Sequence, residues 1–104
     1  MPDMNDMDLL QDYNRQGSEE AFAELVRQQV NLVYSAALRQ VGIAAHAEEI
    51  TQAVFVILAR KSASLRPDTI LDAWLYETTR LTALSFLRGE RRRHEQVSGS
   101  RHWR

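Results

Sequence analysis

Four arginines lie close together near the carboxyl end of the 104-residue chain, at Arg88, Arg91, Arg92 and Arg93. Guanidinium groups are not buried without acidic partners, so this cluster should face solvent or a polyanion. The phosphates of a nucleic acid are the polyanion that such a cluster suits. A solvated cationic helix end, stabilised by the helix dipole, is the alternative explanation for a single basic cluster.

The acidic and basic residues are separated along the chain, although the formal net charge is only -1. Before residue 25, seven acids accompany the single base Arg15, and after residue 79, seven arginines accompany only Glu90 and Glu95. A basic end that attracts a polyanion and an acidic end that repels one favour an oriented encounter with that partner.

Composition excludes several classes of protein. Cysteine is absent, which excludes disulfides and thiolate metal sites and is compatible with a reducing compartment. No apolar run approaches the roughly 20 residues needed to span a bilayer, and the first residues, MPDMNDMD, carry acids where a secretory signal needs positive charge. The sequence therefore predicts a soluble, unexported, cytoplasmic protein with no membrane partner.

Glycine and proline divide the chain into helical segments. Ser18 precedes two glutamates, which is typical of a helix start, because a hydroxyl caps free N–H groups and acids are favourable in the first turn. A shorter helix is expected over residues 7–15, where Leu9 and Leu10 could dock on one side. After Ser18, apolar residues recur mostly at helical spacing as far as Gly42, which should end the helix: Phe22, Leu25, Val26, Leu32, Val33, Ala36, Ala37 and Val41.

The next segment, residues 45–61, has the clearest helical pattern. One continuous stripe should be core: Ala47, Ile50, Thr51, Val54, Phe55, Leu58 and Ser62. Ala53, Val56 and Ile57 lie off this stripe and are apolar too. Either this helix is buried between two neighbours, or it presents a surface to a partner.

A polar break over residues 62–70 contains Pro67, whose ring disfavours helix at the preceding residue. The following helix should fray near Gly89, and residues 96–104 should form a disordered tail or the start of a linker. The sequence thus predicts an all-α protein, a compact bundle of three to four helices, with an acidic segment at 1–17 and one domain at 18–95. The face expected to be buried in the last helix comprises Leu71, Trp74, Leu75, Thr78, Leu81 and Ser85, widened by Ile70, Leu84 and Leu87.

Residues for catalysis are scarce. The three histidines, His46, His94 and His102, are scattered, and only His46 has a possible co-ligand one turn away, at Glu49. There is no Gly-rich phosphate loop and no nucleophile elbow, and the adjacent Glu48 and Glu49 point in different directions around a helix. We therefore expect a binding protein rather than an enzyme, with no cofactor and no metal.

Three segments in order carry a family resemblance: EEAFAELVRQQVNLVYSAAL, AHAEEITQAVFVILARK and LDAWLYETTRLTALSFLRGERRR. They resemble region 2 of extracytoplasmic-function sigma factors in the sigma-70 family, and the likeness covers residues 18–95. The resemblance implies a compact helical domain that docks on a coiled coil of the largest subunit of core RNA polymerase. It also implies recognition and melting of promoter DNA at the minus-ten element, and it allows an anti-sigma factor as a further partner.

The resemblance assigns roles to individual residues. In the family, the exposed side of the second segment holds polymerase, which here implicates Glu48, Glu49, Gln52, Ala53 and Val56. The loop that captures a base flipped from the nontemplate strand corresponds to residues 62–70, where Ser62, Ser64, Arg66 and Asp68 supply donors and acceptors. Trp74 matches an aromatic that contacts DNA near the fork, although packing is its favoured role here. Phosphate contacts are expected from Arg80, Arg88, Arg91, Arg92 and Arg93, with Thr82 as a neutral donor.

The sequence departs from the family pattern in two places. In the last helix, Leu81, Thr82 and Ser85 replace a common Asn, a variable and sometimes basic residue, and a common Asp, which weakens any inherited base preference. In the docking segment, Ala53 and His46 replace acids, so polymerase contact should be more apolar here. Complete sigma factors of this group also carry a second helical domain that reads the minus-thirty-five element, so the chain is expected to be either a fragment or a short version.

Two other functions fit the sequence. A helical protein-interaction module, dimerising or binding an anti-sigma factor without touching DNA, would equally explain the excess apolar residues Ala53, Val56 and Ile57. A small helical enzyme has the least support, because no convergent set of acid, base or metal ligands is visible.

Overall fold

The computed structural model describes residues 5–102, and the side chains of residues 5–93. In chain order the elements are α1 (Asp6–Gln16), α2 (Glu19–Val41), α3 (Ala44–Lys61), the short 3₁₀ helix η1 (Ser62–Ser64) and α4 (Leu71–His102). No strand occurs within residues 5–102, so the predicted all-α helical bundle is confirmed. None of these helices is long and apolar enough to cross a membrane within the described part of the chain.

The helix ends follow the capping residues in the sequence. At the start of α2, the Ser18 hydroxyl accepts a hydrogen bond from the backbone N–H of Ala21 at 3.1 Å, and Asn5 caps α1 in the same way. Gly17 and Gly42 end α1 and α2 in the left-handed conformation, with φ of 66° and 74°, which glycine adopts without steric cost. The start and end expected for the second helix therefore match the structure.

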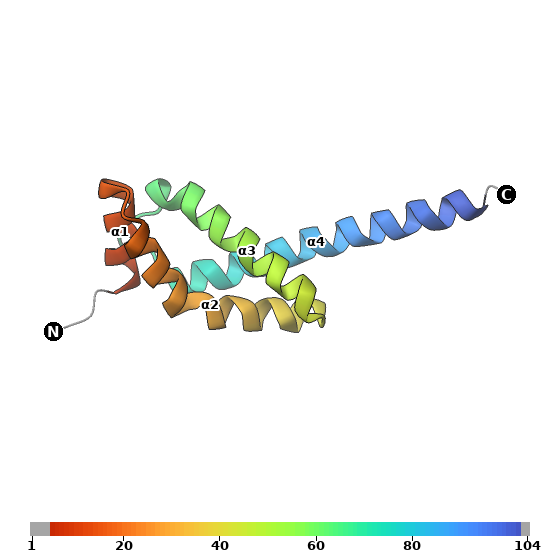
Figure 1. Ribbon diagram of the computed structural model, residues 1–104, viewed down its shortest axis with the longest axis horizontal. Coiled ribbons are helices and arrows are strands. Elements are labelled where there is room, and N and C mark those ends of the chain that lie inside the picture. Colours follow the sequence, from red (N-terminus) through yellow and green to blue (C-terminus); the bar gives the residue numbers. More distant parts are fainter. Residues whose placement is uncertain (1–4, 103–104) are drawn as a thin grey trace.

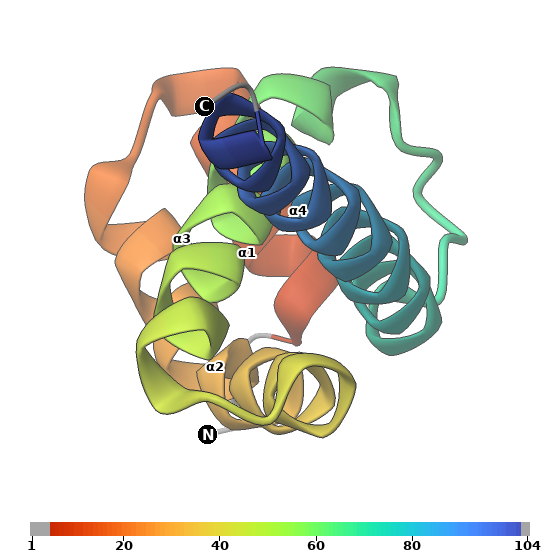
Figure 2. The same cartoon turned by 90° about the vertical axis from the view of Figure 1, so that its right-hand side faces the viewer.

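The core lies where α2 packs against each of the other three helices (Figures 1 and 2). The stripe predicted for α3 is buried along its whole length, and its members meet Leu10 from α1, Leu25 and Val33 from α2 and Leu75 from α4. Full burial of one such aliphatic side chain stabilises the fold by about 1.5–3 kcal/mol. This shared interior fixes the positions of α3 and α4 relative to each other.

The buried face of α4 matches the predicted face only in part. Leu71 and Leu75 are buried as expected, and Thr79 and Ala83 are buried beside them, whereas Leu81 is 52% exposed and Ile70 is 73% exposed. Thr79 fits the interior because its hydroxyl donates to the carbonyl of Leu75 at 2.7 Å, which satisfies its polar group. The prediction of Leu81 and Ser85 as core residues was wrong, because Thr79 and Ala83 occupy the buried face instead and contribute little to a hydrophobic pattern.

The part of α4 that follows Phe86, a residue still packed against the core, extends beyond the bundle, and we call it the arm. Figure 1 shows it leaving the end of the molecule opposite to α1, and the molecule measures 66 × 22 × 22 Å. We expected the helix to fray near Gly89 and residues 96–104 to be disordered, but α4 continues to His102, while residues 103–104 lie outside the described part. One glycine inside a helix costs only about 1 kcal/mol, and the neighbouring Leu87, Arg88, Glu90 and Arg91 are strong helix formers.

Two polar contacts tie α1 to the rest of the bundle. The side-chain amide of the buried Gln29 donates to Asp6 and to Asp72, each at 2.9 Å, and so joins α1, α2 and α4. At the other end of α1, Asn14 and Ser62 bond each other: Asn14 donates to the Ser62 carbonyl at 3.0 Å, and the Ser62 hydroxyl donates to Asn14 at 2.5 Å. Among the described residues, no buried side-chain polar atom lacks a partner.

Candidate nucleic-acid interface and protein-docking face

The five residues expected to hold polymerase lie on one side of α3, opposite its buried stripe. Glu48, Glu49 and Gln52 are exposed, Ala53 is half-buried, and Val56 is 49% exposed. They are spaced three or four residues apart along the helix, which places them in two adjacent rows on one face. The structure therefore brings these five side chains together as one surface, which we call the docking face.

An apolar groove borders the docking face. It lies between α2 and α3 and has a volume of about 520 Å³. Phe22, Val26 and Val30 of α2 form one wall, and residues of α3 form the other: Thr51, Gln52, Phe55, Val56 and Ala59. The Thr51 hydroxyl donates a hydrogen bond to the Ala47 carbonyl at 2.8 Å, so the side-chain amide of Gln52 is the polar group that remains available to a partner.

The sequence left open whether α3 is buried between two neighbours or presents an apolar surface. Both descriptions apply in part, because α3 packs between α2 and α4 and still exposes Val56. Sequence reasoning placed Phe22 and Val26 in the apolar pattern of the second helix and did not identify them as part of a groove. In the structure both are half-buried, so each contributes to the core and to the groove at once.

The loop expected to capture a base does not gather its four polar residues. Ser62 is only 3% exposed, and its hydroxyl bonds Asn14 and the Ala59 carbonyl, so in this structure it is not available for the DNA contact expected of it. The Ser64 hydroxyl donates to the Lys61 carbonyl at 2.8 Å. Arg66 and Asp68 are exposed and pair with each other at 3.5 Å. One of the four residues is thus internal, and the other three make local contacts.

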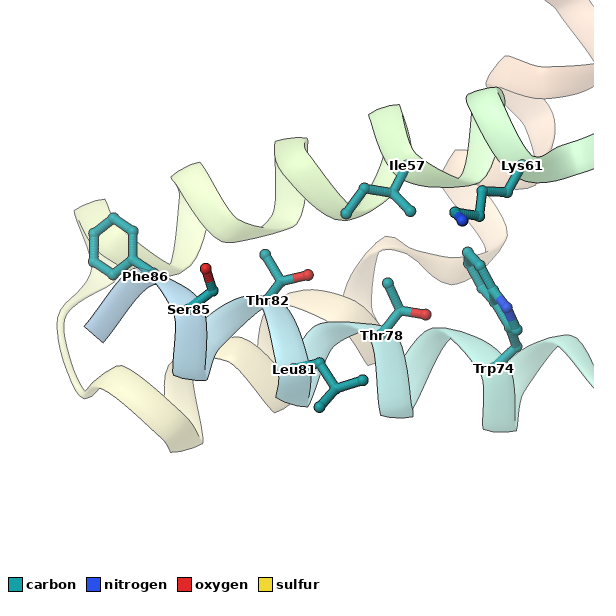
Figure 3. Close-up of a pocket in the computed structure, with 8 residues that line it drawn as sticks. All are labelled: Ile57, Lys61, Trp74, Thr78, Leu81, Thr82, Ser85 and Phe86. Carbon is teal, nitrogen blue, oxygen red and sulfur yellow. The ribbon is translucent and has the colours of Figure 1, made fainter. Parts of the chain in front are cut away.

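A second groove lies between α3 and α4, with a volume of about 640 Å³ (Figure 3). Two of the residues singled out in the sequence, Trp74 and Thr82, line it. Sequence reasoning did not assign the other lining residues to a site, although it had placed Thr78, Leu81 and Ser85 on the core face; they come from both helices: Ile57, Lys61, Thr78, Leu81, Ser85 and Phe86. A signal was present in the hydroxyl residues at positions 78, 82 and 85, whose spacing places them on one side of a helix.

The basic residues of α4 differ in their surroundings. Arg80 is held by Glu77 through two hydrogen bonds, of 3.2 and 2.6 Å, and these hold the pKa of Glu77 below its usual value. Arg93 pairs with Glu90 one turn earlier. Arg88, Arg91 and Arg92 are exposed and form no ion pair with any side chain among residues 5–93. The expected phosphate contacts therefore lie on the arm and the surface next to it.

Comparison with protein families identifies this arrangement. The model of sigma-70 region 2 matches residues 25–93, which is more than half of the chain. The chain belongs to the sigma-70 region 2 family. Such a domain is the part of a sigma factor involved in RNA polymerase binding and promoter melting. No curated protein and no solved structure matches the chain.

The part that matches sigma-70 region 2 contains the docking face, the whole lining of the groove between α3 and α4, all but Phe22 of the other groove, and the α4 arginines through Arg93. Helix α1 lies outside the match, although it holds the start of the 62–70 loop through Asn14. His46, considered above as a metal ligand, packs its ring against Phe86 with a centroid separation of 4.8 Å. The described residues contain no group of three side chains that could hold a metal ion.

Proposed function

We propose that this sigma-70 region 2 domain docks on core RNA polymerase through α3 and binds the nontemplate strand of the minus-ten element through α4. It has no catalytic activity of its own, and it works in the cytoplasm, where both partners would be. The observation that carries the proposal is the family match over residues 25–93, which includes both surfaces. The A-W-L-Y sequence and the following arginines support assignment to the extracytoplasmic-function group.

The docking face suits a helical partner. Helix-in-groove recognition places apolar anchors of one helix in an apolar trough of another surface, with polar residues at the rim. Here the trough is the groove between α2 and α3, and Gln52 and the two glutamates stand beside it. A coiled coil of the largest polymerase subunit fits this description. Ala53, in place of the usual acid, makes the contact more apolar.

The arm suits a DNA strand. Arg88, Arg91 and Arg92 are exposed on α4, and Arg80 and Arg93 lie on the same helix. Each phosphate that is neutralised on a single strand lowers the slope of log K against log salt by about 0.7. Contacts from these five arginines therefore predict a slope of about -3.5, a value that a merely solvated arm would not produce.

Co-elution with core polymerase tests the docking assignment. The variant Glu48→Lys with Glu49→Lys should lose co-elution, because both reversed charges lie on the docking face. The matched control is Glu19→Lys with Glu20→Lys, which reverses the same number of exposed acids at the start of α2. Circular dichroism should show that both variants fold. Equal retention of the two variants would contradict the assignment.

Fluorescence anisotropy of a labelled single strand with a promoter-like minus-ten sequence tests the DNA assignment. Arg91→Ala with Arg92→Ala should weaken binding and reduce the salt slope by about 1.4, that is 0.7 for each lost phosphate contact. The control is Arg15→Ala with Arg39→Ala, two exposed arginines on α1 and α2. A salt response that is flat, or equal in both double variants, would reject the phosphate contacts.

One observation favours a second candidate function. The groove between α2 and α3 is almost wholly apolar, which suits a protein partner whether or not DNA is bound. A protein-interaction module without DNA binding, taking an anti-sigma factor or a second copy of the chain, would use the same groove. Polymerase or self-association without strand binding in the anisotropy experiment would support this candidate.

A further inference from the structure

Helix α1 has no part in the proposed function, and it lies outside the family match, which begins at residue 25. It is nevertheless firmly seated on the bundle. Leu9 and Leu10 are buried in the core, and the rings of Tyr13 and Phe22 lie against each other with a centroid separation of 4.8 Å. Because a packed interior yields little, α1 is a fixed support for whatever its polar side chains hold.

The carboxyl-terminal end of α1 holds the first residue of the 62–70 loop. The side-chain amide of Asn14 donates to the Ser62 carbonyl at 3.0 Å, and its oxygen accepts from the Ser62 hydroxyl at 2.5 Å. The first of these bonds fixes the main chain, so it does not depend on which side chain occupies position 62. A variant of Ser62 that lacks the hydroxyl therefore keeps this bond.

The amino-terminal end of α1 is tied to the residues just after the loop. The buried side-chain amide of Gln29 donates to Asp6 of α1 and to Asp72, in the first turn of α4, each at 2.9 Å. An amide nitrogen carries two N–H groups, so one side chain can serve both carboxylates. Asp6 and Asn14 both belong to α1, so the two ends of the loop are held from points roughly 12 Å apart on one rigid helix.

The loop has little structure of its own to keep its shape. Over residues 65–70 the described structure has two hydrogen bonds from backbone N–H groups to backbone carbonyls. Leu65 donates to Ser62 at 3.3 Å, and Thr69 donates to Arg66 at 3.0 Å. Most side chains of this stretch are exposed, so packing adds little. The path of the loop is therefore set mainly by the contacts at its two ends.

We propose that α1 positions the loop and the first turn of α4 for the bound strand, with Asn14 and Gln29 as the positioning residues. The loop leads directly into α4, on which the proposed strand contacts lie. A loop that is fixed in advance reduces the ordering that strand binding would otherwise require. Neither side chain contacts the strand itself. This inference rests on the proposed DNA binding and adds α1 to the parts of the chain that determine strand affinity.

The test uses Asn14→Leu with Gln29→Met, which keeps the approximate size of both side chains and removes the amides that tie α1 to the loop. The control is Gln28→Met with Asn31→Leu, which makes the same replacements at exposed positions of α2. Both are titrated with the labelled minus-ten strand at a temperature at which circular dichroism shows them folded. The first variant should bind about three- to tenfold more weakly than the intact chain, because its loop must be ordered on binding. The control should bind as the intact chain does.

Further measurements distinguish positioning from a loss of stability. The salt slope of strand binding should not change, because the arginines of the arm are untouched. Affinity for core polymerase should stay the same, because the docking face lies on α3, whereas a partly unfolded variant would lose both partners in proportion. Amide hydrogen exchange should become faster in residues 65–70 and stay slow in α3.

The outcomes separate this inference from the proposed function. Strand binding equal to that of the control, tighter strand binding, or an equal loss of polymerase would each overturn the positioning role, while salt-dependent binding by the intact chain still supported the arm. Absence of strand binding by the intact chain at low salt would overturn both. Asn14→Leu alone frees one end of the loop and should cause a smaller loss, so it keeps the test decisive if the double variant fails to fold. Ser62→Ala, which keeps the bond from Asn14 to the carbonyl, should bind the strand as the intact chain does.

Discussion

The two grooves beside α3 are of similar size but differ in polarity. The groove shared with α2 is lined by apolar side chains with Thr51 and Gln52, whereas the groove shared with α4 adds three hydroxyls and a lysine to its apolar and aromatic side chains. A single helix thus separates the surface that we propose for a protein partner from the one that we propose for a nucleic acid. Sigma-70 region 2 is involved in binding RNA polymerase and melting promoter DNA, and two surfaces that do not overlap suit both tasks.

The largest effect that would test this contrast is expected at Val56. Val56→Glu places a carboxylate in the apolar groove, where a docked partner would remove it from water, so affinity for polymerase should fall about a hundredfold or more. Strand binding should not change. Ile43→Glu is the matched control, because Ile43 is exposed to a similar extent and does not line the groove. Equal loss in the two variants, measured by titration with labelled polymerase, would contradict the docking assignment.

A smaller effect is expected at Lys61, on the other side of α3. Lys61→Glu should weaken strand binding about three- to tenfold at low salt and progressively less as salt rises, because screening shortens the reach of the charge. Polymerase binding should stay the same. Arg60→Glu changes the charge by the same amount at the neighbouring exposed residue, which does not line the groove. Identical losses of strand affinity in the two variants would show a general charge effect and not a contact in the groove.

Substitutions at Ser62 and Ser64 compare the contributions of an interior and a surface hydroxyl of the loop to stability and to strand binding. Ser62→Ala removes the hydrogen bond to Asn14 and should lower the free energy of unfolding by about 1 kcal/mol, which shifts Tm by roughly 4–8 °C. Ser64→Ala should change stability by less than about 0.5 kcal/mol. Neither should alter strand affinity. Weaker strand binding by Ser62→Ala, with Tm unchanged, would restore Ser62 as a DNA contact.

The smallest effect is expected at Leu81. This side chain is 52% exposed, so Leu81→Gln should change the free energy of unfolding by no more than about 0.5 kcal/mol. Leu75→Ala, on the buried face of the same helix, should cost about 2–5 kcal/mol. Denaturant unfolding monitored by circular dichroism measures both values. Similar losses at the two positions would mean that α4 buries the face first expected from its sequence.

The sequence predicted α3 well and α4 less well for a physical reason. Every core position of α3 from Ala47 to Leu58 is apolar or a threonine that bonds its own helix, so periodicity alone located the stripe. In α4, the buried face passes through Thr79 and Ala83, which contribute little to a hydrophobic pattern, and Leu81 diverted the prediction.

Residues that act through distant partners could not be predicted from local pattern. Ser62 is internal because Asn14, 48 residues earlier, meets it across the bundle. Lys61 and Thr82 share a groove only because α3 and α4 pack side by side. The docking face was easier to foresee, because Glu48, Glu49, Gln52, Ala53 and Val56 all belong to one helix and its period places them together.

If α3 and α4 bind different partners, substitutions in the two helices should impair different binding activities. The chain, Glu48→Lys with Glu49→Lys, and Arg91→Ala with Arg92→Ala are each titrated with core polymerase and with the labelled minus-ten strand. We expect the α3 variant to lose polymerase and keep the strand, and the α4 variant to lose strand affinity and keep polymerase. Loss of the same partner in both variants, with both still folded, would contradict this expectation.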